Sequence, residues 1–137
     1  MGFNDAIIEK FHARGGDVGE YWEGKTLVLL HTHGRRSGKE FVNPLVAAPD
    51  GDARVVCGTA GGAPDDPQWV ANLAAADGPV TVEIGTETKQ ADATVYRAGD
   101  PEWERLYTIW RDYWPATADY ETKTDRKFPV ARLVFHS

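Results

Sequence analysis

The run Gly34-Arg35-Arg36-Ser37-Gly38 is the first part of this sequence with the chemistry to hold a ligand. It directly follows an apolar segment typical of a strand. Two guanidinium forks, a hydroxyl group and flexible backbone amides in one turn can converge on a phosphate or a carboxylate. The pattern therefore indicates an anion clamp, and a solvated basic turn is the alternative that local composition leaves open.

A glycine-rich stretch, residues 58–64, follows the apolar segment that ends at Cys57. Its three glycines permit positive φ angles and a close approach of the backbone to a ligand. The stretch has neither the Gly-Lys-Ser/Thr ending of a nucleotide-binding loop nor the spacing of the dinucleotide fingerprint. It is interpreted as a cofactor loop, with a plain turn as the alternative.

Aromatic residues are the third feature. Trp69 and Asn72 lie three residues apart in a helical pattern, so both face one side, where an indole and an amide could contact a ring system. More aromatic residues gather late in the chain, at Trp110, Tyr113, Trp114 and Tyr120. These side chains suit either a pocket for a planar compound or the edge of a hydrophobic core.

The remaining reactive residues give weaker signals. His31 and His33 would point to the same face of a strand, but no third ligand stands in register with them, so we expect no metal site. Cys57 lies in an apolar segment and is expected to be an inert buried thiol. The sequence also lacks the Gly-x-Ser-x-Gly and His-Glu-x-x-His motifs of common hydrolases.

Hydrophobic patterning predicts the elements that position these residues. An amphipathic helix is expected over residues 3–14, with Asn4 as its N-cap and Gly15-Gly16 as its stop. Strands are expected over residues 26–30, 41–48, 53–59, 80–84, 91–98 and 130–135. Two further helices are expected over residues 67–76 and 101–113, preceded by Asp66 and Asp100 as caps. Closely spaced strands without regular βαβ alternation predict an α+β barrel of mostly antiparallel strands.

Composition narrows the class of protein. A chain of 137 residues with 42% hydrophobic and 26% charged residues fits one globular domain. Its formal net charge of -6 disfavours nucleic acid as a partner. The single cysteine allows no internal disulfide and fits a reducing cytoplasm. The N-terminus is typical of neither a secretory signal nor a membrane span.

Several blocks, in their order and spacing, resemble one family closely. They are residues 29–38, 43–45, 61–64, 67–73, 118–120, Thr124 with Arg126, and 129–130. The chain is similar to the deazaflavin (F-420)-dependent nitroreductases from about Phe3 to Leu133. The resemblance implies a split β-barrel over residues 25–135, after an N-terminal helix over residues 1–16, in one domain over residues 1–137.

The resemblance also implies a set of site residues. Those expected to hold coenzyme F-420 are Arg35, Arg36, Ser37, Gly38, Asn43, Pro44, Gly58, Thr59, Ala60, Trp69 and Asn72. Those expected to contact a small-molecule electron acceptor are Phe11, Trp114, Thr117 and Tyr120. In this family the reduced deazaflavin passes a hydride to the acceptor, and Tyr120 is the expected hydroxyl donor. The helix that carries Phe11 is a candidate lid.

Three positions depart from the family pattern. Ala60 replaces a lysine and Phe41 replaces an arginine, and both changes weaken the expected anion clamp. Thr117 replaces a tyrosine of the acceptor pocket. The loss of that ring weighs against nitroimidazoles and favours another electron-poor acceptor, such as a quinone or a different nitro-aromatic compound.

Two other functions stay open at this point. One is an oxidoreductase of the same fold that binds flavin mononucleotide (FMN), and the other is a non-catalytic carrier of the cofactor or of a hydrophobic ligand. Weak attachment of the first helix to the inner face of the cell membrane is a further alternative, although Asp5 and Glu9 offset Lys10 and Arg14 there. The chain is expected to be a monomer or a homodimer.

Overall fold

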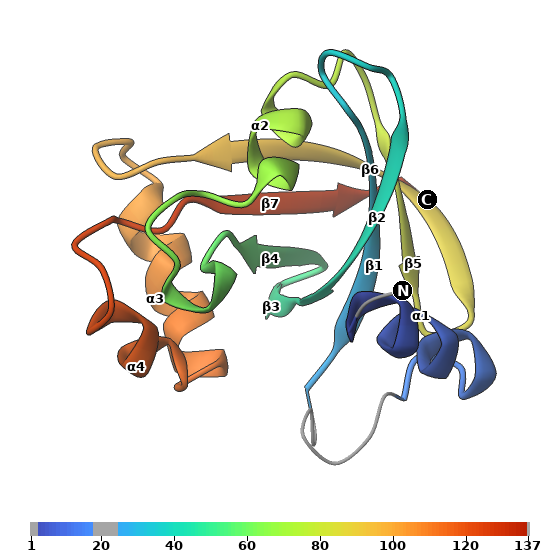
Figure 1. The fold of residues 1–137 in the computed structure, drawn as a ribbon, viewed down its shortest axis with the longest axis horizontal. Coiled ribbons are helices and arrows are strands. Elements are labelled where there is room, and N and C mark those ends of the chain that lie inside the picture. Colours follow the sequence, from blue (N-terminus) through green and yellow to red (C-terminus); the bar gives the residue numbers. More distant parts are fainter. Residues whose placement is uncertain (1–2, 18–24, 137) are drawn as a thin grey trace.

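One antiparallel sheet forms the body of the protein, in a computed structural model that describes residues 3–17 and 25–136 (Figure 1). Its seven strands follow the order β2-β1-β5-β6-β7-β4-β3. They are β1 (Leu27–His33), β2 (Glu40–Val46), β3 (Ala48–Asp50), β4 (Ala53–Cys57), β5 (Val80–Ile84), β6 (Glu87–Tyr96) and β7 (Val130–Phe135). The helices are α1 (Phe3–Ala13), α2 (Gln68–Ala74), α3 (Trp103–Tyr113) and α4 (Thr117–Glu121), with a 3-10 turn η2 (Ala60–Gly62).

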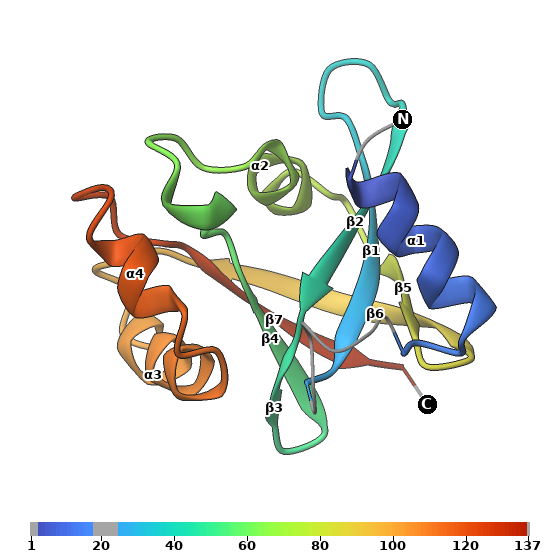
Figure 2. The same cartoon turned by 60° about the horizontal axis from the view of Figure 1, so that its bottom comes forward.

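The sheet curls round so that its two edge strands, which are consecutive in the chain, lie close together. β2 and β3 lie at opposite ends of the strand order, yet only Ala47 separates them in sequence. The backbone N–H of Ala47 donates to the Thr26 carbonyl at 2.9 Å, which ties this crossover to the start of β1. One residue can join the two ends of a sheet only if the sheet bends round on itself, as Figure 2 shows. The predicted α+β split barrel is confirmed.

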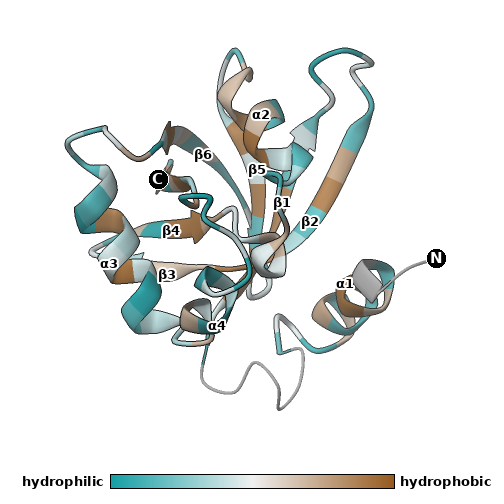
Figure 3. Cartoon of the chain, turned by 60° about the vertical axis from the view of Figure 1, so that its left-hand side comes forward, coloured by the Kyte–Doolittle hydropathy of each residue, from teal (hydrophilic) through white to brown (hydrophobic). Residues whose placement is uncertain are grey.

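The two faces of the sheet pack in separate apolar clusters. Along β1, Val28 and Leu30 pack with the α2 residue Leu73, whereas Leu27 and Leu29 belong to the cluster on the opposite face. This alternation follows from the two-residue period of a strand. Figure 3 shows the same mixture of apolar and polar residues along β2. Both faces of the sheet are therefore covered by apolar packing.

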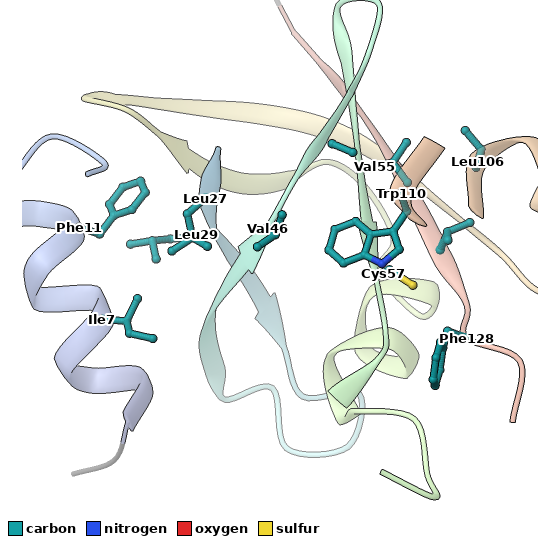
Figure 4. Close-up of a cluster of buried hydrophobic side chains, with 12 residues drawn as sticks. Ile7, Phe11, Leu27, Leu29, Val46, Val55, Cys57, Leu106, Trp110 and Phe128 are labelled. Carbon is teal, nitrogen blue, oxygen red and sulfur yellow. The ribbon is translucent and has the colours of Figure 1, made fainter. Parts of the chain in front are cut away.

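The first helix packs on the sheet through its apolar side. Ile7 and Phe11 are only 7% and 1% exposed, and they point toward Leu27 and Leu29 (Figure 4). Their burial makes this side of α1 a packing face, and within residues 5–13 it leaves little apolar surface for lipid. Among the described helices, none combines the length and the hydropathy that crossing a bilayer requires.

All predicted strands occur, with some shifted ends. The expected strands 80–84 and 130–135 coincide with β5 and β7. β1 continues to His33 because residues 31–33 pair with the start of β2 across a hairpin. The expected strand 41–48 is two strands, since the chain leaves β1 after Val46 and pairs with β4 from Ala48 onward. The short elements η2 and α4 were not predicted, because neither is long enough to show a period.

The three predicted helix caps are wrong. Asn4 lies inside α1, and the N-caps of α2 and α3 are Pro67 and Glu102, without side-chain capping bonds. The two aspartates instead serve other donors: Asp66 pairs with arginines, and Asp100 accepts the backbone N–H of Arg97 at 2.6 Å. The guanidinium groups at Asp66 are stronger donors than a helix terminus, whereas Asp100 is engaged by a backbone N–H of the turn before α3.

Asp50 fixes the short edge strand β3 to its neighbours. Its carboxylate accepts Nε of Arg132 on β7 at 2.8 Å and Nη1 of Arg105 on α3 at 3.2 Å. Hydrogen bonds from Arg105 and Arg132 hold the pKa of Asp50 below its usual value, against the opposing effect of burial. The pair of bonds therefore links β3, β7 and α3.

Substitution of Asp50 by asparagine should lower the free energy of unfolding at pH 7 by about 1 kcal/mol, because both arginines are partly exposed and solvent screens them. Because folding lowers the pKa of Asp50, its charged carboxylate stabilises the folded protein at pH values above the unfolded-state pKa of 3.8. This contribution disappears as the pH falls below that value. Urea unfolding from pH 7 to pH 3 should show the gap between wild type and Asp50→Asn closing. Asp92→Asn, which removes an exposed carboxylate beside His136, is the control; a gap independent of pH would contradict the assignment.

Candidate functional site

A cavity of about 260 Å³ lies where β2, the end of β4, the start of α2 and the α3–α4 corner meet. We call it the aromatic cavity. Its lining residues are Asn43, Pro44, Leu45, Val46, Cys57, Thr59, Ala60, Gly61, Pro67, Trp69, Trp110, Trp114 and Tyr120. The structure thus brings together residues that are up to 77 positions apart in sequence (43 to 120). A flat, largely apolar ligand with a few polar atoms suits this lining.

Three helices supply the walls of the aromatic cavity. Trp69 comes from the first turn of α2 and is 5% exposed, and Trp110 comes from the last turn of α3 and is 4% exposed. Trp114 caps the end of α3, and Tyr120 lies on α4. These rings come together because α3 and α4 pack beside the loop that precedes α2 (Figure 2).

Tyr120 presents a hydroxyl group at this wall. Its Oη accepts a hydrogen bond from Nε1 of Trp114 at 3.3 Å. That bond occupies a lone pair of the oxygen and does not use the hydroxyl proton, which is left to donate elsewhere. Tyr120 is therefore suited to give a proton to an oxygen bound in the aromatic cavity.

The 58–66 loop forms the other side of the cavity and depends on its glycines. A Cβ at Gly58 would lie 2.7 Å from Cγ2 of Val70, and one at Gly62 would lie 2.8 Å from the Tyr120 carbonyl oxygen. Ala60, Gly61 and Gly62 have φ angles of 46°, 64° and 89°, so three consecutive residues have positive φ. Such a path costs energy at Ala60 and requires support from the surrounding structure.

Arg126 supplies that support. Its guanidinium donates to the carbonyl oxygens of Gly58 at 3.0 Å, Thr59 at 3.0 Å and Ala63 at 3.0 Å, and it also pairs with the carboxylate of Asp66. The side chain is 13% exposed. One largely buried cation therefore binds the 58–66 loop at four points. The sequence does not predict this role for Arg126, because no local pattern shows which arginine of a chain is buried.

Six positions of the expected cofactor site do not line the aromatic cavity: Arg35, Arg36, Ser37, Gly38, Gly58 and Asn72. Arg35 donates from Nη1 to Oδ1 of Asn72 at 2.8 Å and from Nη2 to Oε1 of Gln68 at 2.9 Å. Arg35 and Asn72 line a second cavity of about 340 Å³, and Gly58 is buried at the start of the 58–66 loop. Gln68 nevertheless stands between the aromatic-cavity residues Pro67 and Trp69, so the Arg35 guanidinium lies beside the first turn of α2.

The rest of the basic turn is exposed to solvent. Arg36, Ser37 and Gly38 are exposed, and Oγ of Ser37 accepts the backbone N–H of Lys39 at 3.2 Å. Nζ of Lys39 lies 5.7 Å from the ring centroid of Phe41. A cation thus remains beside the position at which the family pattern has an arginine.

Two residues expected to contact the acceptor lie outside the cavity. Phe11 is in the core beneath α1, and Thr117 is completely buried behind the tryptophan wall. Trp110, by contrast, lines the cavity and was named in the sequence only as part of an aromatic group. Helical periodicity cannot tell a core face from a cavity wall, since both are apolar.

His31 of β1 and His12 of α1 both hydrogen-bond to the carboxylate of Glu83. Nε2 of His31 meets Oε2 of Glu83 at 2.7 Å, and Nε2 of His12 meets Oε1 of the same carboxylate at 2.8 Å. Burial acts to raise the pKa of Glu83, but these hydrogen bonds outweigh it and lower that pKa. His33 is exposed at the strand end. In residues 3–17 and 25–136 no three His, Cys, Asp or Glu side chains are grouped so that they could hold a metal ion.

Cys57 lines the aromatic cavity, but its environment makes the thiol unreactive. It is 5% exposed, and burial raises the pKa of its thiol well above the usual value. A protonated thiol is a poor nucleophile. The expected inert, buried cysteine is thus what the structure shows.

Substitution of Arg126 by alanine should lower the free energy of unfolding by about 3 kcal/mol, because three carbonyl groups and one carboxylate lose a buried charged donor. Arg126→Lys should fall between this variant and wild type, since an ammonium group cannot reproduce the fork. Chemical denaturation measures the loss. Arg97→Ala, which removes a 52% exposed partner of the same Asp66, is the control and should cost below about 1 kcal/mol. Equal losses in the two alanine variants would rule out the special role of Arg126.

Comparison with known proteins places this geometry in a family. An F420H(2)-dependent quinone reductase of Mycobacterium tuberculosis (strain H37Rv) is 31% identical over 132 residues, which cover 95% of this chain and 86% of that protein. A solved F420-H2 dependent reductase (FDR-A) superposes with a TM-score of 0.65 at 31% identity and covers 78% of this chain and 92% of its own. A structure described as a domain-swapped dimer gives a TM-score of 0.68 at 26% identity, with 94% of both chains covered.

The family model reaches over nearly the whole chain. Residues 6–134 match the model described as F420H(2)-dependent quinone reductase. This range includes every residue that lines the aromatic cavity and all seven strands except the last residue of β7. The chain therefore belongs to the F420H(2)-dependent quinone reductase family.

Proposed function

We propose that this protein binds reduced coenzyme F-420 in the aromatic cavity and uses it to reduce a quinone. The observation that carries the proposal is the cavity lining. It joins cofactor residues expected from the sequence, such as Asn43, Pro44 and Thr59, to the expected acceptor residues Trp114 and Tyr120. Membership of the family supplies the identity of the cofactor.

The cavity fits the ring system of a deazaflavin. The indole of Trp69 suits a flat, apolar ring, and Asn43 and Thr59 offer polar groups to its heteroatoms. The anionic tail of the coenzyme requires cations near the cavity entrance. Arg35, beside the first turn of α2, and the exposed Arg36 of the same turn are the residues proposed to meet it.

When bound, reduced F-420 supplies the hydride. The residues of this chain have three other tasks: to hold the acceptor against the ring, to limit the access of water and to deliver a proton. The tryptophan walls perform the first two, because apolar surfaces on several sides fix a planar compound and exclude water. Tyr120 is proposed to perform the third, with its hydroxyl oriented by the Trp114 indole.

A quinone fits this wall better than a compound that needs many polar contacts. The position of the family's pocket tyrosine is taken by Thr117, which is buried, so the indoles of Trp110 and Trp114 form the surface instead. An apolar wall with one hydroxyl at Tyr120 suits a flat acceptor with a carbonyl oxygen. Nitro-aromatic compounds are the second acceptor class, because a nitro group also presents an oxygen to that hydroxyl.

We further propose that the protein works in the cytoplasm as a homodimer. The single cysteine, which allows no internal disulfide, favours that compartment, and the structural relative described as a domain-swapped dimer favours the assembly. Light scattering after size exclusion gives the mass directly, and a mass near 15.1 kDa would refute the dimer. Co-sedimentation with anionic liposomes tests the weak membrane contact, and protein left wholly in the supernatant would exclude it.

Purified protein should bind F-420 in preference to FMN when fluorescence is followed at low salt.

Replacement of both Arg35 and Arg36 by alanine should weaken F-420 binding by about 3 kcal/mol, since two charged hydrogen-bond donors to the tail are lost. Lys89→Ala, which removes a cation of β6 that does not line the aromatic cavity, is the control. Preference for FMN would favour the flavin enzyme, and binding of F-420 without turnover would favour the carrier. If neither compound binds, the chain shares only the fold of the F-420-dependent reductases.

Substitution of Tyr120 by phenylalanine should reduce kcat for quinone reduction about 100-fold while F-420 affinity stays unchanged, because the ring remains and only the proton donor is lost. Tyr107→Phe is the control, since that hydroxyl donates to Glu121 at 2.7 Å and Tyr107 is absent from the cavity lining. Stopped-flow oxidation of reduced F-420 gives the rate. A kcat within twofold of wild type would remove Tyr120 from the proton-donor role.

A further inference from the structure

Thr117 makes two hydrogen bonds at the back of the tryptophan wall. It is 0% exposed and stands at the first residue of α4. Its Oγ1 donates to the carbonyl of Trp114 at 2.7 Å and accepts from Nε1 of Trp110 at 3.0 Å. Both tryptophans line the aromatic cavity, whereas Thr117 is not part of the lining.

These bonds restrict the Trp110 indole. The ring is 4% exposed, and a buried indole N–H requires an acceptor if burial is not to be costly. Thr117 is the acceptor that the structure provides, and threonine is stiff because its Cβ is branched. The position of Oγ1 therefore selects one orientation of the ring.

The same hydroxyl restrains Trp114 through its main chain. Trp114 ends α3 with φ −125° and ψ 79°, outside the helical region, so its carbonyl has left the helix ladder. Across the α3–α4 corner this carbonyl accepts both the backbone N–H of Thr117, at 3.0 Å, and its hydroxyl, at 2.7 Å, so the hydroxyl adds a second restraint to the one from the main chain. Because the Trp114 indole in turn donates to Tyr120, the hydroxyl of Thr117 influences two tryptophans directly and Tyr120 at second hand.

We propose that Thr117 is a positioning residue for the electron acceptor: it fixes the orientation of the Trp110 and Trp114 walls and thereby sets the affinity for the quinone. It does so without touching the quinone. The proposal rests on the proposed reductase function. It replaces the direct contact that the family's tyrosine implies at this position with an effect transmitted through the tryptophans.

Thr122 makes the same kind of local hydrogen bond as Thr117 but lies away from the tryptophan wall. Its Oγ1 also donates to the carbonyl three residues earlier, that of Asp119, at 2.6 Å. Thr122 is exposed and adjoins the C-terminus of α4. Thr122 does not line the aromatic cavity, so Thr122→Val is a matched control for Thr117→Val.

The experiment compares wild type with Thr117→Val, Thr117→Ser and Thr122→Val. The acceptor probe is 2-methyl-1,4-naphthoquinone, used in two assays: steady-state oxidation of reduced F-420, and quenching of tryptophan fluorescence in the protein alone. Thr117→Val should raise KM for the quinone and its Kd from quenching about fivefold to tenfold, as expected for one lost hydrogen bond. We expect kcat and the Kd for F-420 to change less than about twofold. Thr117→Ser should restore wild-type values, and Thr122→Val should retain them.

Two results would overturn the positioning role. One is Thr117→Val with unchanged quinone affinity. The other is a parallel loss of kcat, quinone affinity and F-420 affinity, which marks a general defect of folding. If circular dichroism shows that Thr117→Val does not fold, Trp110→Phe replaces it, since it removes the donor and keeps the threonine; it should raise the quinone Kd by a similar factor, and an unchanged Kd refutes the proposal.

The two proposals fail in different ways. Quinone binding without turnover in wild type would overturn the reductase function and leave the role of Thr117 in quinone affinity intact. Quinone binding that Thr117→Val does not weaken would overturn the positioning role alone. Absence of quinone binding to wild type would overturn both.

Discussion

The geometry of the site depends above all on the guanidinium of Arg126. The 58–66 loop passes through left-handed residues at Ala60 and Gly61 and presses against α4 at Gly62. A backbone in this state does not hold its shape unaided. Arg126 compensates by binding three of its carbonyls and Asp66, and the ring of Phe128 lies 4.7 Å from the guanidinium carbon. With the loop fixed, one wall of the aromatic cavity has a defined position.

The opposite wall is fixed by hydrogen bonds of aromatic side chains. Trp110 binds Thr117, Trp114 binds Tyr120, and Thr117 returns to the main chain of Trp114. These bonds connect the end of α3 to α4 across a sharp corner. The two walls also meet each other, because α4 packs against the loop at Gly62. A cavity between two such rigid walls is suited to position a planar cofactor and its acceptor.

The charged groups divide between stability and binding. Asp50, Arg105 and Arg132 join β3, α3 and β7, whereas Glu83 joins α1 to β1 and β5 through His12 and His31. The basic turn after β1 takes little part in such pairs, apart from Arg35 with Asn72 and Gln68. Its exposed cations on an acidic protein are accordingly available to an anionic ligand.

The sequence by itself determined the strands, the antiparallel split barrel and the family, since alternation, glycine turns and ordered motif blocks are local properties that a chain carries unfolded. It also identified most of one cavity wall, from Asn43 to Trp69, because those residues stand in motif blocks. Only the tertiary structure decided that Phe11 is core, that Thr117 lies behind the wall rather than in it, and that Arg126 organises the loop. Their partners lie on other elements, and Arg126 meets its partners 60 to 68 residues away. Burial and hydrogen bonding at that separation arise from packing, which no local pattern encodes.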